Sequence, residues 1–502
     1  MSPRKLAALL VLGAGLAAAP ALAQTLRIGL AEDPDVLDPT LARTFVGRIV
    51  FAATCDKLLD LDEKLNVVPQ LATSYQWSPD YKSLTLKIRQ GVTFHDGEKL
   101  DAAAVKFNIE RHKTMPGSTR KGELASVASV DVVDPYTVRL NLSAPFVPLL
   151  AVLTDRAGMM VSPKAAKAEG EKFGAHPVCA GPFRFVDRVA QGRITFERFA
   201  NYWNKDAIHF DKVVYEPIVD SQVRLANLKS GQLDLIERFA PSDMAGLKAD
   251  SRFKVSKIVE IGYQGITINL GKSDLAKTSV LKDPRVREAF ELSIDRHGVV
   301  DVAQEGEGMA GNQWVAPTNS WYSKAVPIPK RDVARAKELL REAGVPNPSF
   351  TLMTPTTSDA QRFAQVIQAM AKEAGFDVKI QSTEFSTSLD MADKGQFEAY
   401  VLAWSGRADP DGNLQSHLGC KQPLNYAGYC NAEVDDWIAR SRATGDRAER
   451  QKYFDKIAMQ VAKDRPIIYV YHRHWLWAYT NKLSGLRSVP DGMIRLQGLK
   501  MN

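Results

Sequence analysis

Apolar and polar positions along the chain repeat with a period of two in some segments and about 3.6 in others. Residues 84–88 (LTLKI) and 266–270 (ITINL) have the strand period. Residues 332–344 and 359–375 carry apolar residues at helical spacing, begin with an Asp or Ser cap, and end with a Gly. Each is followed by a β-type run, SFTLM or FDVKI. This repetition predicts an α/β fold in which βα units cover a mixed sheet.

Two further helices are indicated by their first residues. Asp101 is placed to cap a helix over 101–112, after a turn-rich segment at 91–100. Pro284 occupies the position of a first helical residue, and we expect that helix to continue until Gly298 stops it.

The first 23 residues have the pattern of a secretory signal peptide. Arg4 and Lys5 precede an apolar run over about 6–19, and Ala21 and Ala23 form a small-x-small cleavage site. We therefore expect a mature chain that begins at Gln24, without a lipid anchor, in an oxidising compartment outside the cytoplasm. The alternative is an N-terminal core helix.

Length and charge limit the classes of protein. About 480 mature residues exceed what one hydrophobic core usually supports, so two or more lobes are expected. Loss of Arg4 and Lys5 lowers the net charge from +7 to +5. This charge is mild, and no basic run with interleaved aromatic residues occurs, so we expect no nucleic-acid partner.

Four cysteines are expected to be paired in an oxidising compartment. Cys420 and Cys430 enclose a short local segment, and Cys55 with Cys179 follows by elimination. The alternative is a metal site, but C-x9-C without a nearby His lacks the usual zinc spacing.

Several apparent catalytic or metal motifs are incomplete. Segment 265–273 ends like a phosphate-binding loop but has five residues between its glycines instead of four. Residues 409–413 (DPDGN) begin like a calcium loop, yet its sixth and twelfth positions are Leu414 and Cys420. His472 and His474 lie on one face of an expected strand without a third metal ligand in view. We therefore expect neither a metal site nor a cofactor.

An ordered set of motifs extends over nearly the whole mature chain. The motifs are residues 58–111, GPFRFV at 181–186, NYWNK at 201–205 with DKVVY at 211–215, LKSGQLDL at 228–235, PRVREAFELSIDR at 284–296 and KELLREAG at 337–344. Together they resemble the family-5 extracytoplasmic solute-binding proteins of bacterial ABC importers, which bind dipeptides, oligopeptides or nickel.

The resemblance implies a two-lobed clamshell of the large type II class, with an extra subdomain on the first lobe. The implied first lobe is 24–268 plus 481–502, with the subdomain at about 60–180, and the second lobe is 269–480. Chain crossings are expected near 263–270 and around 475–483. Hinge closure would bury the solute, and the closed form would dock on an inner-membrane permease. A periplasmic monomer without enzymatic activity is expected.

The resemblance also places ligand residues in 404-WSGR-407. In dipeptide-binding relatives this segment is W-[ST]-G-D, where the Asp pairs with the peptide ammonium. Trp404, Ser405 and Gly406 match, whereas Arg407 has the opposite charge. In one alternative, Asp409 pairs with the ammonium group of the ligand in place of the missing Asp. In the other, Arg407 pairs with a carboxylate or similar anion of the ligand. The remaining alternative is that Arg407 points to solvent.

Further candidates follow from the same resemblance. Arg362 matches a family arginine that holds the peptide carboxylate, although the alignment can slip to Gln361, and a surface ion pair is the alternative. Cys420 and Cys430 fall where dipeptide-binding relatives have a disulfide bond. Asn425 and Tyr426 inside that loop, and Tyr263 at the first crossing, are also candidate cleft residues.

The sequence thus predicts a periplasmic protein that binds a peptide or peptide-like anionic or zwitterionic solute. A metal-chelate binder of the nickel type is the alternative within the family. A secreted hydrolase using Asp409 and Asp411 is the alternative from another class, but no nucleophile or metal accompanies them.

Overall fold

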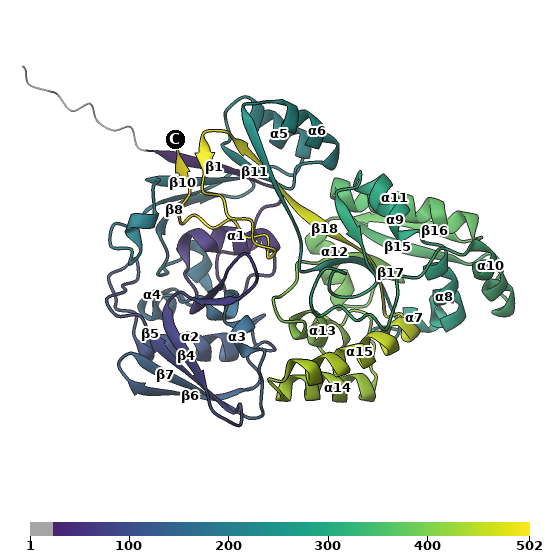
Figure 1. The fold of residues 1–502 in the computed structure, drawn as a ribbon, viewed down its shortest axis with the longest axis horizontal. Coiled ribbons are helices and arrows are strands. Elements are labelled where there is room, and N and C mark those ends of the chain that lie inside the picture. The colour runs from purple at the N-terminus through teal and green to yellow at the C-terminus, as the bar shows by residue number, and fades with distance from the viewer. Residues whose placement is uncertain (1–23) are drawn as a thin grey trace, which may run out of the picture.

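A computed structural model describes residues 24–502, so the expected signal peptide lies outside the described part of the chain. The chain forms two lobes joined by long strands (Figure 1). A twelve-stranded sheet passes through both, in the order β16-β15-β17-β13-β18-β11-β1-β10-β9-β8, with β12 and β14 also paired to β18. No helix in the described residues is long and apolar enough to cross a membrane.

The first lobe is built on the N-terminal half of the chain. Strand β1 pairs in parallel with β10 and β11, and β10, β9 and β8 continue the sheet antiparallel. Its elements are β1 (Thr25–Leu30), α1 (Phe45–Thr54), β2 (Leu59–Leu61), β3 (Val67–Pro69), β8 (Phe183–Val189), β9 (Arg193–Arg198), β10 (Lys212–Pro217), α5 (Ser221–Lys229), β11 (Leu235–Glu237), α6 (Met244–Ala249), β12 (Phe253–Val259), β19 (Leu483–Ser484) and β20 (Lys500–Met501).

A separate four-stranded antiparallel sheet, in the order β4-β5-β7-β6, is inserted in this lobe and has its own apolar core. Its elements are β4 (Ala72–Trp77), β5 (Ser83–Ile88), α2 (Ala102–Thr114), β6 (Val127–Asp134), β7 (Thr137–Leu142), α3 (Leu149–Val152) and α4 (Pro163–Glu169). The predicted strand at 84–88 and the Asp101 cap are confirmed, since the Asp101 side chain accepts a hydrogen bond from the Ala104 amide.

The second lobe contains the predicted βα units. Strands β15 and β16 pair in parallel, and helix α11 connects them and packs on both, as expected for a βα unit. The elements are β13 (Tyr263–Ile268), α7 (Leu275–Thr278), α8 (Pro284–Leu292), α9 (Arg296–Ala303), β14 (Gly308–Ala310), α10 (Val333–Glu342), β15 (Ser349–Pro355), α11 (Ser358–Glu373), β16 (Asp377–Thr383), α12 (Phe385–Asp393), β17 (Ala399–Trp404), α13 (Asp411–Leu418), α14 (Ala432–Ala443) and α15 (Arg447–Asp464).

The helix expected from Pro284 to Gly298 is wrong in its second half. Helix α8 ends at Leu292, and the Asp295 side chain accepts hydrogen bonds from the amides of His297 and Gly298, which starts α9. Gly298 therefore lies inside the first turn of a new helix. The internal Asp cap, which the apolar periodicity concealed, divides the segment in two.

Strand β18 (Ile467–Thr480) belongs to both lobes. Its first residues pair with β13, and residues 474–480 pair with β12. We therefore call residues 24–259 with 475–502 the first lobe and 263–471 the second lobe, with crossings at 260–262 and 472–474. This division places β13 in the second lobe, whereas the sequence-based boundary at 268 placed it in the first.

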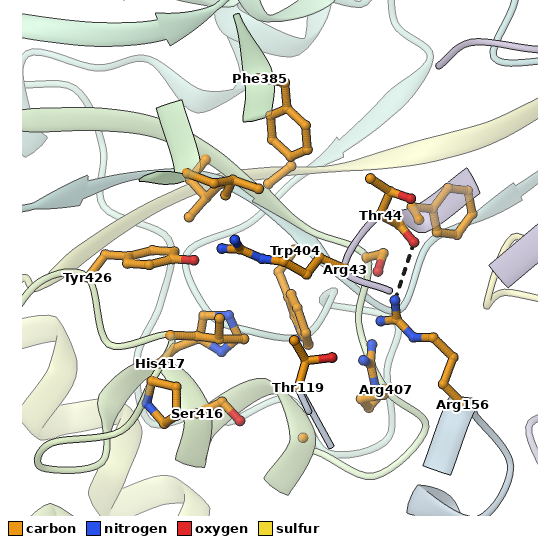
Figure 2. A pocket seen from close by; sticks show the side chains of 18 of the residues that line it. Arg43, Thr44, Thr119, Arg156, Phe385, Trp404, Arg407, Ser416, His417 and Tyr426 are labelled. Atoms are coloured by element: carbon orange, nitrogen blue, oxygen red, sulfur yellow. Dashed lines mark hydrogen bonds between the residues drawn. The ribbon is translucent and has the colours of Figure 1, made fainter. Parts of the chain in front are cut away.

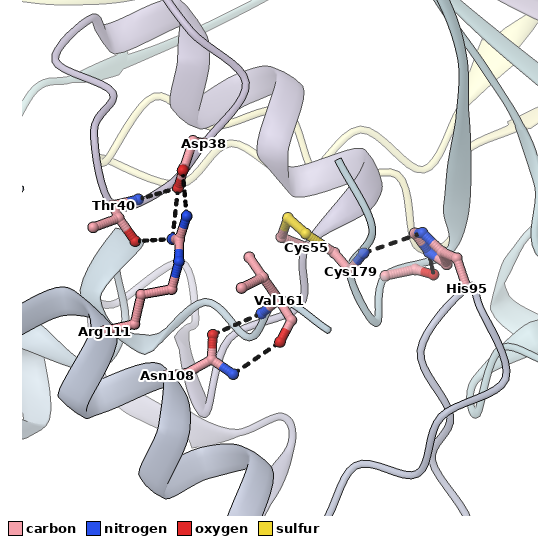
Figure 3. The surroundings of a disulfide bond; sticks show 9 residues. Asp38, Thr40, Cys55, His95, Asn108, Arg111, Val161 and Cys179 are labelled. Carbon is pink, nitrogen blue, oxygen red and sulfur yellow. Dashed lines mark hydrogen bonds and ion pairs between the residues drawn. A yellow bond between two sulfur atoms is a disulfide. The ribbon is translucent and has the colours of Figure 1, made fainter. Parts of the chain in front are cut away.

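Two disulfide bonds are present, Cys55–Cys179 and Cys420–Cys430. Cys55 directly follows α1, and Cys179 directly precedes the loop into β8, so the first bond spans the base of the inserted subdomain (Figure 3). Beside it, the His95 amide donates to the Cys179 carbonyl at 2.9 Å. This bond therefore holds the subdomain to the main sheet of the first lobe.

Candidate functional site

A cavity of about 650 Å³ lies between the lobes and is lined by residues of both. Its size falls within the range of small-molecule sites. Figure 2 shows side chains of both lobes lining this cavity. Arg43, Thr119 and Arg156 come from the first lobe, and Trp404 and Tyr426 come from the second. The inter-lobe position makes this cavity the candidate binding site.

The 404–407 segment forms one wall and is shaped by Asn413. The Asn413 side-chain oxygen accepts hydrogen bonds from Trp404 Nε1 at 2.9 Å and from the Arg407 amide at 2.8 Å. Its Nδ2 donates to the Ile261 carbonyl in the first crossing at 3.0 Å. Gly406 has φ +79°, and a Cβ there would lie 2.3 Å from the Ile261 carbonyl carbon. The segment is thus fixed against the crossing, and only glycine fits at 406.

Arg407 faces the cleft, and its guanidinium crosses to the first lobe. Its Nε lies 2.9 Å from Asp155 Oδ2, and the side chain is 10% exposed. Its guanidinium carbon also lies 4.6 Å from the centre of the Trp404 ring, a cation–π distance. Arg407 therefore neither points to solvent nor stands free: it joins the two lobes.

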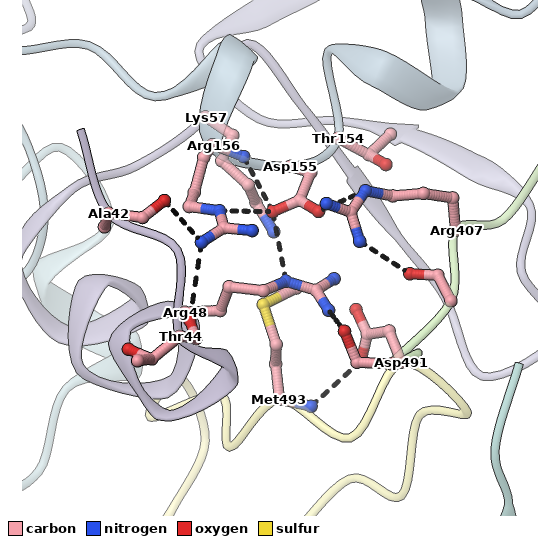
Figure 4. Close-up of polar contacts among 12 residues, drawn as sticks. Ala42, Thr44, Arg48, Lys57, Thr154, Asp155, Arg156, Arg407, Asp491 and Met493 are labelled. Atoms are coloured by element: carbon pink, nitrogen blue, oxygen red, sulfur yellow. Dashed lines mark hydrogen bonds and ion pairs between the residues drawn. The ribbon is translucent and has the colours of Figure 1, made fainter. Parts of the chain in front are cut away.

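Four arginines gather around Asp155, and we call Arg48, Arg120, Arg156 and Arg407 the arginine cluster. Figure 4 shows Arg48, Arg156 and Arg407 converging on this carboxylate. The Arg48 Nε lies 3.1 Å and the Arg156 Nε 3.9 Å from Asp155 Oδ1. Burial alone would raise the pKa of Asp155, but Arg407, Arg48 and Arg156 hold it well below its usual range. The carboxylate is therefore charged, and the cluster keeps an excess of positive charge.

Arg156 is the member of this cluster with the weakest anionic compensation. Its side chain is only 4% exposed, it lines the cavity, and it donates to the Ala42 carbonyl at 2.8 Å, while its Nε has no hydrogen-bond partner. Burial and the neighbouring Arg120 lower the pKa of Arg156. A second anion entering the cavity would relieve this unfavourable environment.

A second charged region lies at the crossings. Arg473 has its Nε 3.4 Å from Glu260 Oε2 and its Nη1 3.6 Å from Asp359. Arg238 pairs with Glu32 at 2.8 Å, and all five of these residues line the cavity. Arg473 therefore joins the two crossings to the second lobe, whereas Arg238, which also lies 3.1 Å from the buried Glu237, pairs within the first lobe.

The remaining second-lobe wall is largely apolar. It is formed by side chains of α12, β17 and the disulfide-bonded loop, namely the partly buried Phe385, Leu389, Leu402 and Leu424 and the buried Tyr426. His417 lies behind Trp404, with ring centroids 4.5 Å apart. Burial, together with Arg407, lowers the pKa of His417 to about 3, so this imidazole is neutral near pH 7.

The mouth of the cleft carries ion pairs between the lobes. Arg43 of the first lobe lies 3.3 Å from Asp393 and 3.8 Å from Asp390 on α12 of the second. Elsewhere, the Val147 amide donates to the Arg442 carbonyl across the cleft at 3.0 Å. These contacts require the lobes to lie together.

Replacement of Arg43 by Gln should speed dissociation of a bound solute about 1.4- to 5-fold, because partly exposed ion pairs contribute about 0.2–1 kcal/mol. Salt should reduce the difference between variant and wild type. Dissociation rates measured by stopped-flow fluorescence at low and high salt check this. Arg335→Gln, which removes exposed pairs within α10 of one lobe, is the matched control and should leave the rate unchanged.

The other sequence candidates are placed as follows. Trp404, Ser405, Arg407 and Asp409 line the cavity, whereas Gly406 does not, because it faces the crossing. The Asp409 carboxylate is held by both terminal nitrogens of Arg450 at 2.8 and 2.7 Å. Asp409 is therefore not free to replace an aspartate at position 407.

Besides Gly406, three further candidates are absent from the cavity lining. Tyr263 is buried against Tyr469, with ring centroids 4.7 Å apart. Asn425 is buried in its own loop, where its Nδ2 donates to the Gly419 and Tyr429 carbonyls. Arg362 lies on α11 and does not reach the cavity, although Asp359 one turn earlier does.

Sequence reasoning missed most of the charged lining. Arg43 and Arg120 lie in loops and Arg156 begins a 3-10 helix of only three residues, so no periodicity marks them. Arg473 lies between His472 and His474, the two histidines considered as metal ligands. The His472 Nδ1 donates to the Gly262 carbonyl at 2.6 Å, and His474 contacts Glu307. In residues 24–502 no group of three or more His, Cys, Asp or Glu side chains is arranged to hold a metal ion.

Comparison with known proteins gives consistent matches. The model of the bacterial extracellular solute-binding proteins, family 5 middle, matches residues 66–425. The glutathione-binding protein GsiB of Salmonella paratyphi A is 28% identical over 498 residues, which cover 96% of each chain.

Solved structures agree in fold. The binding protein AgaA from A. tumefaciens R10, in complex with agropinic acid, is 26% identical with a TM-score of 0.85, covering 95% of this chain and 99% of that one. The periplasmic binding protein DppA from Helicobacter pylori, in complex with the peptide STSA, is 25% identical with a TM-score of 0.85, covering 95% and 98%. The expected two-lobed type II fold is confirmed. Because the family model matches well over half of this chain, the chain belongs to the family 5 bacterial extracellular solute-binding proteins.

Proposed function

We propose that this protein is the solute-binding component of an ABC importer, which captures a small peptide-like solute in the periplasm and delivers it to a membrane permease. The relatives named above bind glutathione, agropinic acid or a peptide. The observation that carries the proposal is the inter-lobe cavity with the arginine cluster on its wall. These features suit a solute with at least one anionic group.

The proposed cycle is opening and closing of the two lobes about residues 260–262 and 472–474. The solute binds the open form, and closure brings Arg156 of the first lobe and Trp404 of the second onto it. Binding at a lobe interface removes water from charged groups, so each charge of the solute needs a partner in the cleft. The cycle needs no covalent chemistry, and we propose that the protein is not an enzyme.

Native mass spectrometry of protein purified from its host without refolding tests this function. We expect a co-purified organic acid of a few hundred daltons and no tightly bound metal by elemental analysis. A nickel or calcium ion at one equivalent would favour a metal carrier instead. Appreciable turnover of peptide or ester substrates would refute the binding-only function.

Replacement of Arg407 by Gln should weaken solute binding about 10- to 100-fold, since a hydrogen bond to a charged group contributes about 1.5–3 kcal/mol. The effect is limited because Arg48 and Arg156 continue to compensate Asp155. Titration calorimetry of variant and wild type measures the change. Unchanged affinity would show that the contact between Arg407 and Asp155 does not contribute to the closed, solute-bound form.

A further inference from the structure

The carboxylates at the crossings outnumber the arginines that face them. The cavity is lined there by three carboxylates, which we call the acidic cluster: Glu32, Glu260 and Asp359. The guanidinium of Arg473 serves two of them, at 3.4 Å from Glu260 and 3.6 Å from Asp359. One positive charge therefore faces two negative charges at this part of the cavity wall.

The third carboxylate of the acidic cluster shares its arginine as well. Arg238 lies 2.8 Å from Glu32 and 3.1 Å from Glu237, a buried carboxylate behind the cavity wall. Arg224 and Arg362 do not line the cavity, and within residues 24–502 neither lies within 4 Å of a carboxylate oxygen. The Arg224 guanidinium donates instead to main-chain carbonyls. Four carboxylates thus share two arginines, and the region keeps an excess of negative charge.

Glu260 has a carboxylate oxygen that accepts no hydrogen bond. The side chain is 1% exposed, and its Oε1 accepts from Gln264 Nε2 at 3.0 Å and from the Arg473 amide at 2.8 Å. Its buried Oε2 accepts none, although the Arg473 Nε lies 3.4 Å away. Burial raises the pKa of Glu260, and Arg473 offsets only part of that effect. An N–H donor of a solute in the cavity would satisfy this oxygen.

The acidic cluster and the arginine cluster lie on one cavity, within the length of a short peptide. Members of both clusters line it. Phe45 contacts both regions, because the guanidinium carbons of Arg48 and Arg238 each lie 5.7 Å from the centre of its ring. These two carbons are therefore no more than twice that distance apart. An extended chain covers such a span with about three residues, at roughly 3.5 Å each.

We propose that the solute is a zwitterion that binds with its carboxylate at the arginine cluster and its ammonium group at the acidic cluster. The inference rests on the proposed function and narrows its solute class to short peptides and similar molecules with a free amino group. Each charge of the solute then leaves water for a region with an excess of the opposite charge, as favourable burial requires.

This direction is opposite to that of the dipeptide pattern, in which an Asp in place of Arg407 pairs with the ammonium. Here Arg407 and its neighbours make that end of the cavity positive, and the ammonium is directed to Glu260 Oε2 at the crossings. The reversal of charge at 407 is thus matched by carboxylates elsewhere on the same cavity.

The test uses the mature wild-type protein, freed of bound solute by unfolding and refolding. The probes are three peptide sets made from one mixture of di- and tripeptides with uncharged side chains: one with free termini, one N-acetylated and one C-amidated. All sets are presented together at equal concentration, and retained species are identified by native mass spectrometry. We expect free peptides to be retained at least about 10-fold over either modified set, because each modification leaves one buried charge of the cleft unpaired.

Variants of the two clusters test the direction of binding. Glu260→Gln should lower the ratio of free to N-acetylated peptide at least about 5-fold and keep the ratio of free to C-amidated peptide. Asp359→Asn, whose side chain is 41% exposed, should act in the same sense and replaces the first variant if that one does not fold. Arg156→Met should lower only the ratio of free to C-amidated peptide. Glu338→Gln, exposed on α10, is the matched control and should change neither ratio.

Equal or greater retention of either modified set by the wild-type protein would overturn the inference and leave the solute-binding function intact. The converse response of the two ratios in the variants would show the opposite direction of binding and overturn it as well. Unchanged ratios in the folded Glu260→Gln and Asp359→Asn proteins would contradict the role of the acidic cluster. Retention of none of the sets would reject the peptide-like solute of the proposed function and the inference with it.

Discussion

Replacement of Arg156 by Met should weaken binding of the carboxylate-bearing solute that co-purifies with the protein about 100-fold or more. Loss of one partner from a buried charge pair typically costs about 3–5 kcal/mol, which corresponds to about 100-fold to several thousandfold in Kd. The lower end is expected, because Arg120 and Arg407 remain in the cluster. Titration calorimetry with the co-purified solute measures this loss.

Two further variants separate binding from folding. Arg156→Lys keeps the charge but loses the planar fork of donors, so its affinity should lie between those of the Met variant and wild type. Arg335→Met, on the exposed face of α10, removes an arginine far from the cavity and should bind normally. A Kd for Arg156→Met within threefold of wild type would exclude the arginine cluster as the anion site.

The elements of the second lobe could be predicted because their signals are local. Helix α10 has its Asp332 cap and α11 its apolar spacing, and the strands after them follow directly in sequence. Local signals also gave one wrong prediction. The apolar spacing over 284–298 indicated a single helix, but Asp295 caps a second helix within that segment. The path of β18 was not predictable, because 14 residues at about 3.3 Å each span both lobes without any break in composition.

The candidate site shows where sequence reasoning stops. The change of sign at Arg407 was visible, and the structure places that residue on the cleft. Its partner Asp155 is more than 250 positions away, and Asp409, which precedes α13, is neutralised by Arg450 in α15. Pairing between such distant residues decides which charges remain free for a solute. The sequence therefore identified the segment that forms one wall of the cleft. It did not show which charged side chains of the cleft remain free to bind a solute.

Removal of the Cys55–Cys179 bond should destabilise the protein by about 5 kcal/mol, the largest stability effect expected here. The bond closes a loop with a sequence separation of 124, and the chain-entropy model assigns about this contribution to so long a loop. The loop contains the whole inserted subdomain, which carries Arg120 and the β4-β5-β7-β6 sheet. Urea unfolding of the Cys55→Ala/Cys179→Ala protein, followed by circular dichroism, measures the loss.

Cys420→Ala/Cys430→Ala is the matched control, because it removes a bond that closes a loop with a separation of only 10. The same model assigns it about 3 kcal/mol or less. If loop entropy dominates, the first double variant must lose more stability than the second. Equal losses would instead place the main contribution in the folded-state packing around each bond. The first variant should also weaken solute binding, because a subdomain loosened at its base no longer holds Arg120 and Glu123 against Arg407.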